Sequence, residues 1–154
     1  MGVTVRTSID IDRPSEHVWA YFDDHRHDLA WRHPSLKRLE RIGDGPVGPG
    51  TRYEGVIGFA GKDYPYVSEV TEYKPPTRVA WRGVSSAGWL IGSEGSYTLE
   101  SSQGATRLTH EITLNPNKFG GKLVMPLISA MGPKRRQGLV MPLLKQLKEE
   151  LEKR

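Results

Sequence analysis

Hydrophobic and polar residues alternate through much of residues 3–114, as they do in strands that bury one face and expose the other. Residues 3–11 carry valine, threonine and isoleucine at odd positions, which predicts a strand with its odd residues inward. In residues 107–114 the apolar positions are even, and His110 falls among them, on the side predicted to be buried. Similar runs bounded by turn residues predict further strands at 36–42, 53–59, 64–73, 79–81 and 91–100.

Two short helices are predicted between the first and second strands. Pro14 suits the first turn of a helix, Asp23 or Asp24 can cap a second one, and Pro34 ends it. The apolar contacts of these helices are predicted to be Val18, Trp19 and Phe22 in the first and Leu29 and Trp31 in the second.

A long amphipathic helix is predicted from Gly120 to about Glu152. Prolines interrupt it, so we expect a kink or break at Gly132-Pro133 and a gentler bend near Pro142. The part before the break, residues 123–131, is the more apolar one and is predicted to act as a gate over an interior space. The buried stripe after the break is predicted to contain Leu139, Val140, Leu143, Leu144, Leu147 and Leu151, which recur at helical spacing.

The order of these elements predicts an α+β fold. Short turns, among them Gly61-Lys62-Asp63 and Gln103-Gly104, join successive strands into an antiparallel meander of about six to seven strands. A curved sheet wrapped around the long C-terminal helix leaves a space between them. Because the chain has 154 residues and no repeat or change in composition, we expect residues 1–154 to form a single domain.

Composition narrows the function classes. The chain has no cysteine, which excludes disulfides and thiolate chemistry, and no apolar run approaches the roughly 20 residues of a membrane span. With no signal-peptide pattern either, we expect a soluble, cytoplasmic protein. The net charge of +4 permits an anionic partner, yet only Lys134-Arg135-Arg136 form a tight cluster, so we expect no nucleic-acid partner.

Five short motifs occur in this chain in one familiar order. They are Ile9-Asp10-Ile11 followed by Pro14 and Val18-Trp19, the segment Trp31 to Pro34, Gly48-Pro49-Gly50-Thr51, the segment Glu69 to Pro76, and the segment Gly104 to Thr109. In these residues the chain resembles the helix-grip fold of the SRPBCC superfamily, which includes START-type lipid carriers, pathogenesis-related allergens and polyketide cyclase/dehydrase-like proteins. The resemblance implies an apolar cavity between sheet and long helix that holds hydrophobic small molecules. Some polyketide cyclase-like members catalyse ring closure or dehydration there.

His110 is the first candidate for chemistry. An imidazole on a cavity wall can act as a general acid or base, and a buried histidine with one hydrogen bond explains the same position. Tyr53, Tyr66 and Tyr97 can orient a carbonyl or phenol ligand, or serve as core aromatics. The catalytic pair, if the protein is an enzyme, is predicted to be His110 with Tyr97.

Further ligand contacts are predicted around the same space. Rim aromatics can stack on a planar ligand or pack under a loop, and Arg32 can pair with a carboxylate or phosphate group or remain on the surface. The predicted contacts beyond the tyrosines and His110 are Trp31, Arg32, Trp81, Trp89, Met125, Ile128 and Met131. The histidines and glycines match neither a metal site nor a phosphate loop, so we expect no metal and no cofactor.

Three hypotheses follow. The first is a carrier of a hydrophobic, lipid-like or aromatic small molecule, and the second is a cyclase- or dehydratase-type enzyme working with acid–base groups in the cavity. The third is a protein that docks through its basic surface on ribosomes or membranes. The run of apolar and basic residues from Lys122 to Arg136 suits a transient membrane contact, or simply a helix that closes the sheet. The oligomeric state stays open.

Overall fold

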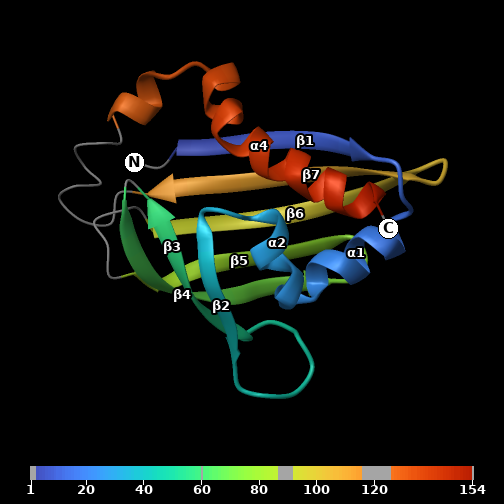
Figure 1. Ribbon diagram of the computed structural model, residues 1–154, viewed down its shortest axis with the longest axis horizontal. Coiled ribbons are helices and arrows are strands. Elements are labelled where there is room, and N and C mark those ends of the chain that lie inside the picture. Colours follow the sequence, from blue (N-terminus) through green and yellow to red (C-terminus); the bar gives the residue numbers. More distant parts are fainter. Residues whose placement is uncertain (1–2, 60, 87–91, 116–125, 154) are drawn as a thin grey trace.

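The computed structural model describes residues 3–59, 61–86, 92–115 and 126–153. Seven strands form one antiparallel sheet in the order β1-β7-β6-β5-β4-β3-β2 (Figure 1). The strands are β1 (Val3–Ile11), β2 (Leu36–Ile42), β3 (Arg52–Phe59), β4 (Lys62–Lys74), β5 (Arg78–Ser86), β6 (Gly92–Ser102) and β7 (Ala105–Asn115). Strands β2 to β7 follow one another as a meander, and β1 joins beside β7.

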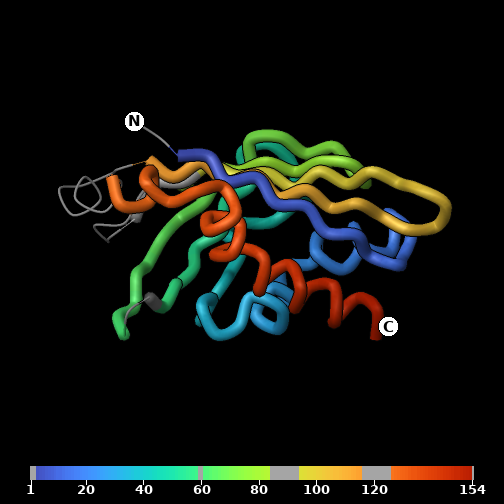
Figure 2. The backbone as a smooth tube through the Cα atoms, turned by 90° about the horizontal axis from the view of Figure 1, so that it is seen from above, coloured from blue at the N-terminus to red at the C-terminus, as the bar shows by residue number. Residues whose placement is uncertain are grey.

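The helices lie on one side of the curved sheet (Figure 2). They are α1 (Ser15–Asp23), the 3-10 turn η1 (His25–His27), α2 (Asp28–Trp31) and α4 (Pro133–Glu152). This confirms the predicted α+β class and its helix-grip arrangement of a curved antiparallel sheet around a long C-terminal helix, with two short helices after the first strand. No helix in the described ranges is long and apolar enough to cross a bilayer.

Alternation along the strands sets which side chains face the helices. In β1 the residues at positions 3, 5, 7 and 11 are buried, which confirms the predicted inward face. Cross-strand pairing then aligns Thr7 with His110, His110 with Tyr97, and Tyr97 with Val79. Because partners directly opposite each other point to the same face of a sheet, these four residues form one inner row across β1, β7, β6 and β5.

The terminal helix breaks where its sequence predicts. Residues 126–130 are helical, the helix stops at Met131, and α4 starts again at Pro133, at a position where proline suits the first turn. Pro142 lies inside α4, and Figure 1 shows the helix axis changing direction along its length, as an internal proline would cause. The predicted start near Gly120 lies outside the described residues.

The hydrophobic core includes the buried leucines of the second half of α4. Its buried members are Ile11, Val18, Trp19, Tyr21, Phe22, Trp31, Leu99, Leu108, Leu144, Leu147 and Leu151. Two predicted contacts are wrong. Leu139 is 58% exposed, because at 3.6 residues per turn it points well away from Leu144 and Leu147, and Leu29 is 41% exposed on α2. The hairpin turn predicted at Gly61-Lys62-Asp63 is shorter than expected, because β4 already begins at Lys62, which pairs with Phe59 of β3.

Candidate functional site

The inner face of the central strands carries a cluster of one imidazole and three aromatic rings. Tyr97 on β6 lies beside its cross-strand partner His110 on β7, with ring centroids 4.9 Å apart. Trp81 on β5 lies 5.0 Å from Tyr97 and stacks toward His110 at 6.1 Å. Trp31 on α2 reaches Tyr97 edge-on at 6.2 Å. The structure therefore brings four of the predicted site residues together.

Two strand glycines allow these rings to lie flat against the sheet. A Cβ atom at Gly95 would stand 2.6 Å from Cζ2 of Trp81, its cross-strand partner. A Cβ at Gly55 would stand 2.8 Å from the ring of Tyr66, which is likewise its partner. Both glycines are part of the site's shape, and the sequence analysis missed them. Glycine inside a strand pattern, which often marks a close approach, was the available signal.

His110 is held as a neutral imidazole. Its side chain is 7% exposed, and burial together with the nearby positive charge of Arg32 lowers its pKa to about 4. Within the described part of the chain, neither Nδ1 of His110 nor Oγ1 of the adjacent Thr7 has a hydrogen-bond partner, although both atoms are buried. Buried polar atoms are normally paired, so this position suits an acceptor or donor from outside the chain, such as a water or a ligand.

The tyrosines of the cluster remain protonated. Burial raises the pKa of Tyr97 well above its ordinary value, and Arg32 offsets only part of that rise. Burial also raises the pKa of Tyr66, again against the effect of Arg32. Each phenol therefore keeps its proton at neutral pH and can donate a hydrogen bond.

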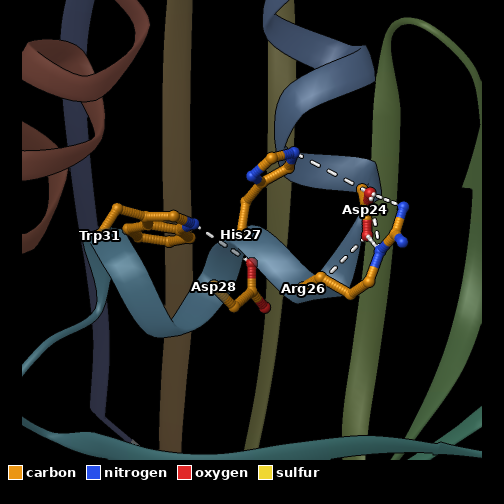
Figure 3. Close-up of polar contacts among 5 residues, drawn as sticks. All are labelled: Asp24, Arg26, His27, Asp28 and Trp31. Atoms are coloured by element: carbon orange, nitrogen blue, oxygen red, sulfur yellow. Dashed lines mark hydrogen bonds and ion pairs between the residues drawn. The ribbon is translucent and has the colours of Figure 1, made fainter.

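Arg32 brings a positive charge to the cluster from the end of α2. Its Nη1 lies 3.6 Å from Oδ2 of Asp28, one helical turn earlier, and its guanidinium lies 5.9 Å from the Trp31 ring. The other oxygen of Asp28 accepts a hydrogen bond of 3.1 Å from Nε1 of Trp31 (Figure 3). Asp28 was missed in the sequence analysis, although its spacing of four residues from Arg32 is typical of a helical ion pair.

The other predicted contacts lie apart from this cluster or outside the described residues. Tyr53 is half-buried and faces His25 of η1, with ring centroids 5.4 Å apart. Ile128 and Met131 are half-buried around the break before α4. The predicted contacts Trp89 and Met125 fall outside the described residues.

The remaining histidines have separate surroundings. His27 lies 3.9 Å from Asp24 (Figure 3). It also stacks on Tyr21 at 4.3 Å, whereas His25 faces Tyr53. No group of three or more histidine, aspartate or glutamate side chains in the described ranges is arranged to hold a metal ion.

Comparisons with known structures give the same fold. The protein TTHA0849 from Thermus thermophilus matches with a TM-score of 0.75 at 22% identity, covering 97% of each chain. The Zhui aromatase/cyclase from Streptomyces sp. R1128 matches with a TM-score of 0.76 at 15% identity, over 100% of this chain and 96% of its own. A START superfamily protein from Mycobacterium smegmatis matches with a TM-score of 0.72 at 13% identity, covering 97% of each chain. These likenesses establish the fold.

The sequence comparisons establish the family. A comparison with curated protein sequences found no match. The family model described as polyketide cyclase / dehydrase and lipid transport matches residues 2–152. With nearly the whole chain matched and the START-like fold around it, this protein belongs to the polyketide cyclase/dehydrase and lipid-transport family of the SRPBCC superfamily.

Proposed function

We propose that this protein binds a hydrophobic, aromatic small molecule between the central strands and the helices. The observation that carries the proposal is the cluster of His110, Tyr97 and Trp81 on the inner face of the sheet. In this cluster, Nδ1 of His110 is buried and has no hydrogen-bond partner in the described part of the chain, and flat apolar rings lie beside the imidazole. Ligand sites typically combine a mostly apolar lining with a few polar groups that fix orientation.

The exposure of the inner face supports a space in front of this cluster. Tyr97 and Trp81 belong to central strands, beneath the helix layer, yet both remain half-buried. Leu99, also on β6, and Leu108, on the neighbouring β7, are 3% and 0% exposed, because they pack in one core with residues of α1 and α4. A ligand that buried about 200 Å² of apolar surface there would gain about 5 kcal/mol, at 25 cal/mol per Å².

The test is the uptake of N-phenylnaphthylamine, a neutral dye whose emission rises in apolar surroundings. We expect saturable micromolar binding by the unmodified protein, and an affinity about tenfold lower in Trp81→Leu because a stacking surface is lost. Leu139→Ser is the control, since it removes an apolar side chain exposed outside the site. If Leu139→Ser abolished the uptake while Trp81→Leu left it unchanged, the dye would bind the surface and the proposal would be wrong.

Acid–base catalysis is the second candidate function, and the protonation states of the cluster favour it. His110 is neutral at pH 7 and can take a proton, Tyr97 keeps its proton and can donate a hydrogen bond, and Arg32 is positive beside them. Neighbouring groups whose pKa values are pushed apart are the usual basis of paired acid–base roles. Removal of a proton next to a carbonyl, with the enolate oxygen held by Tyr97, suits this set.

This second function can be tested without knowledge of the natural substrate. Alpha-tetralone in D₂O exchanges its α-protons through the enolate, and NMR follows the exchange. We expect the protein to accelerate it and His110→Gln to reduce the acceleration by about 100-fold or more. His33→Gln, at an exposed position, is the matched control. If the protein bound alpha-tetralone without accelerating the exchange, catalysis would be wrong and only the ligand-binding function would stand.

A further inference from the structure

Arg32 is a charged side chain under the helix layer whose ion pair is loose. The closest approach to Asp28 is 3.6 Å, outside hydrogen-bonding range, and the Arg32 side chain keeps 27% of its surface accessible. Asp28 is only 15% accessible and its Oδ1 is taken by the indole of Trp31. A guanidinium has five N–H donors in a rigid fork, so Arg32 retains donors for another acceptor.

Apart from the carboxylate of Asp28 and the ring of Trp31, the groups near Arg32 are neutral hydrogen-bonding groups. Its charge lowers the pKa of His110 and opposes the raised pKa of Tyr66 and of Tyr97, which places all three side chains within its field. At pH 7 His110 is uncharged and both tyrosines are phenols. The surroundings of Arg32 are therefore apolar or neutral and hydrogen-bonding, apart from Asp28, whose charge also acts on Tyr66 and Tyr97.

We infer that the ligand is a planar aromatic molecule with one anionic oxygen group, which Arg32 binds while the rings lie against Trp81 and Tyr97. This inference rests on the proposed function and names the ligand class for the same site. A carboxylate, a sulfonate or a phenolate would complete the guanidinium's hydrogen bonding, and Tyr66 and Tyr97 could donate to the same group. A cationic ligand would meet the charge of Arg32 and be disfavoured.

Two dyes with the same ring scaffold test the inference. Anilinonaphthalene sulfonate differs from N-phenylnaphthylamine by its sulfonate, so the ratio of their affinities isolates the anionic group. We expect the unmodified protein to prefer the sulfonate. Arg32→Gln should lower the ratio of the sulfonate affinity to the neutral-dye affinity at least about tenfold.

A second variant should change the affinity for the sulfonate dye in the opposite direction. Asp28→Asn removes the competing carboxylate but keeps an acceptor for the Trp31 indole, so it should raise the affinity for the sulfonate severalfold. Partly unfolded proteins also bind this dye, so the gain counts only if urea denaturation shows that Asp28→Asn unfolds in the same cooperative transition as the unmodified protein.

Control variants identify where the anion binds. Arg26→Gln removes a guanidinium that is 80% exposed on η1, and it should change neither affinity. Lys134→Gln with Arg135→Gln removes the charges that line a surface hollow at the start of α4, and the preference should survive. If the preference survived Arg32→Gln but vanished in the Lys134/Arg135 variant, the anion would bind that hollow and the inference would be overturned.

The outcomes also separate this inference from the proposed function. If neither dye binds, the proposed function fails. If the neutral dye binds at Trp81 but the sulfonate is not preferred, the proposed function stands and the anionic ligand class is wrong.

Discussion

The inner face of the sheet is covered in two different ways along its length. At one end Leu99 and Leu108 lie beneath the second half of α4, where Leu144, Leu147 and Leu151 are at most 1% exposed. By contrast, Tyr97, two residues before Leu99 on β6, and Trp81, on the neighbouring β5, are only half-buried. In the first half of α4, Gln137, Gly138 and Leu139 are all exposed.

Both halves of α4 are nevertheless attached to β1. In the second half, Lys148 donates to the carbonyl oxygen of Asp10 at 2.6 Å, and Glu152 accepts from the backbone N–H of Asp12 at 3.0 Å. In the first half, the side-chain amide of Gln137 donates to the carbonyl oxygen of Arg6 at 3.0 Å. What differs is therefore the apolar packing. One end of the molecule supplies stability, and the other keeps polar groups close to accessible space.

The largest expected effect comes from breaking the packed end. Leu147→Ala removes a side chain with 0% exposure and should lower the free energy of unfolding by roughly 2–5 kcal/mol. Val140→Ala, in the first half of α4, should lower it by only about 1 kcal/mol, because Val140 is half-buried. Urea denaturation of both variants measures the difference. Equal losses would mean that the two halves of α4 are packed alike.

The second effect is a pH dependence that originates in His110. The folded pKa of about 4 lies below the ordinary value of 6.5, so the unfolded chain takes up this proton first as the pH falls. The stability that neutral His110 contributes is complete above pH 6.5 and is lost as the pH falls from 6.5 to 4. The loss amounts to roughly 3 kcal/mol.

His110→Gln isolates this effect from other titrating groups. Asp24 and Asp28 titrate in both proteins and cancel when the two unfolding free energies are subtracted at each pH. We expect the difference between wild type and variant to change by about 3 kcal/mol between pH 7 and pH 4. A difference that stays constant over this range would contradict a buried, neutral His110.

The third effect concerns the shape of the site. Gly95→Ala places a Cβ 2.6 Å from the Trp81 ring, which must move, and overpacking of this kind costs about 1–3 kcal/mol. Gly58→Ala is a matched strand control, because its nearest neighbour is the far end of the flexible Lys37 side chain, at 2.7 Å. Unfolding measurements and the tryptophan emission spectrum should change in Gly95→Ala and hardly in Gly58→Ala. Equal changes in the two variants would mean that the Trp81 ring is not confined by Gly95.

Much of the fold could be predicted because its signals are periodic. The alternation in β7 placed His110 on the inner face, and the two-residue turn Gln103-Gly104 follows from residues that accept positive φ, here 50° and 81°. That turn sets the register in which His110 and Tyr97 are partners. The burial of His110 could therefore be predicted from a local sequence pattern.

The features that could not be predicted depend on contacts that no periodic pattern in the sequence indicates. Gly95 and Trp81 meet across two strands, so a glycine within a strand indicates a close approach but the sequence around it does not name the partner. Asp28 and Arg32 lie at the ends of a helical turn too short to show amphipathicity. Leu139 was misplaced because the break and the internal proline of α4 obscure where the buried stripe begins.

The smallest expected effect distinguishes a structural tyrosine from a site tyrosine. Tyr73 donates a hydrogen bond of 2.9 Å to Oδ2 of Asp23, so Tyr73→Phe should cost about 1 kcal/mol of stability. The same variant should raise the pKa of Asp23 further, because that hydrogen bond opposes the rise caused by burial. Tyr97→Phe should instead weaken binding of the sulfonate dye and change stability less than Tyr73→Phe does. Urea denaturation and dye titration of both variants measure these effects. If Tyr73→Phe lost dye binding as strongly as Tyr97→Phe, the two ends of the inner face would not act separately.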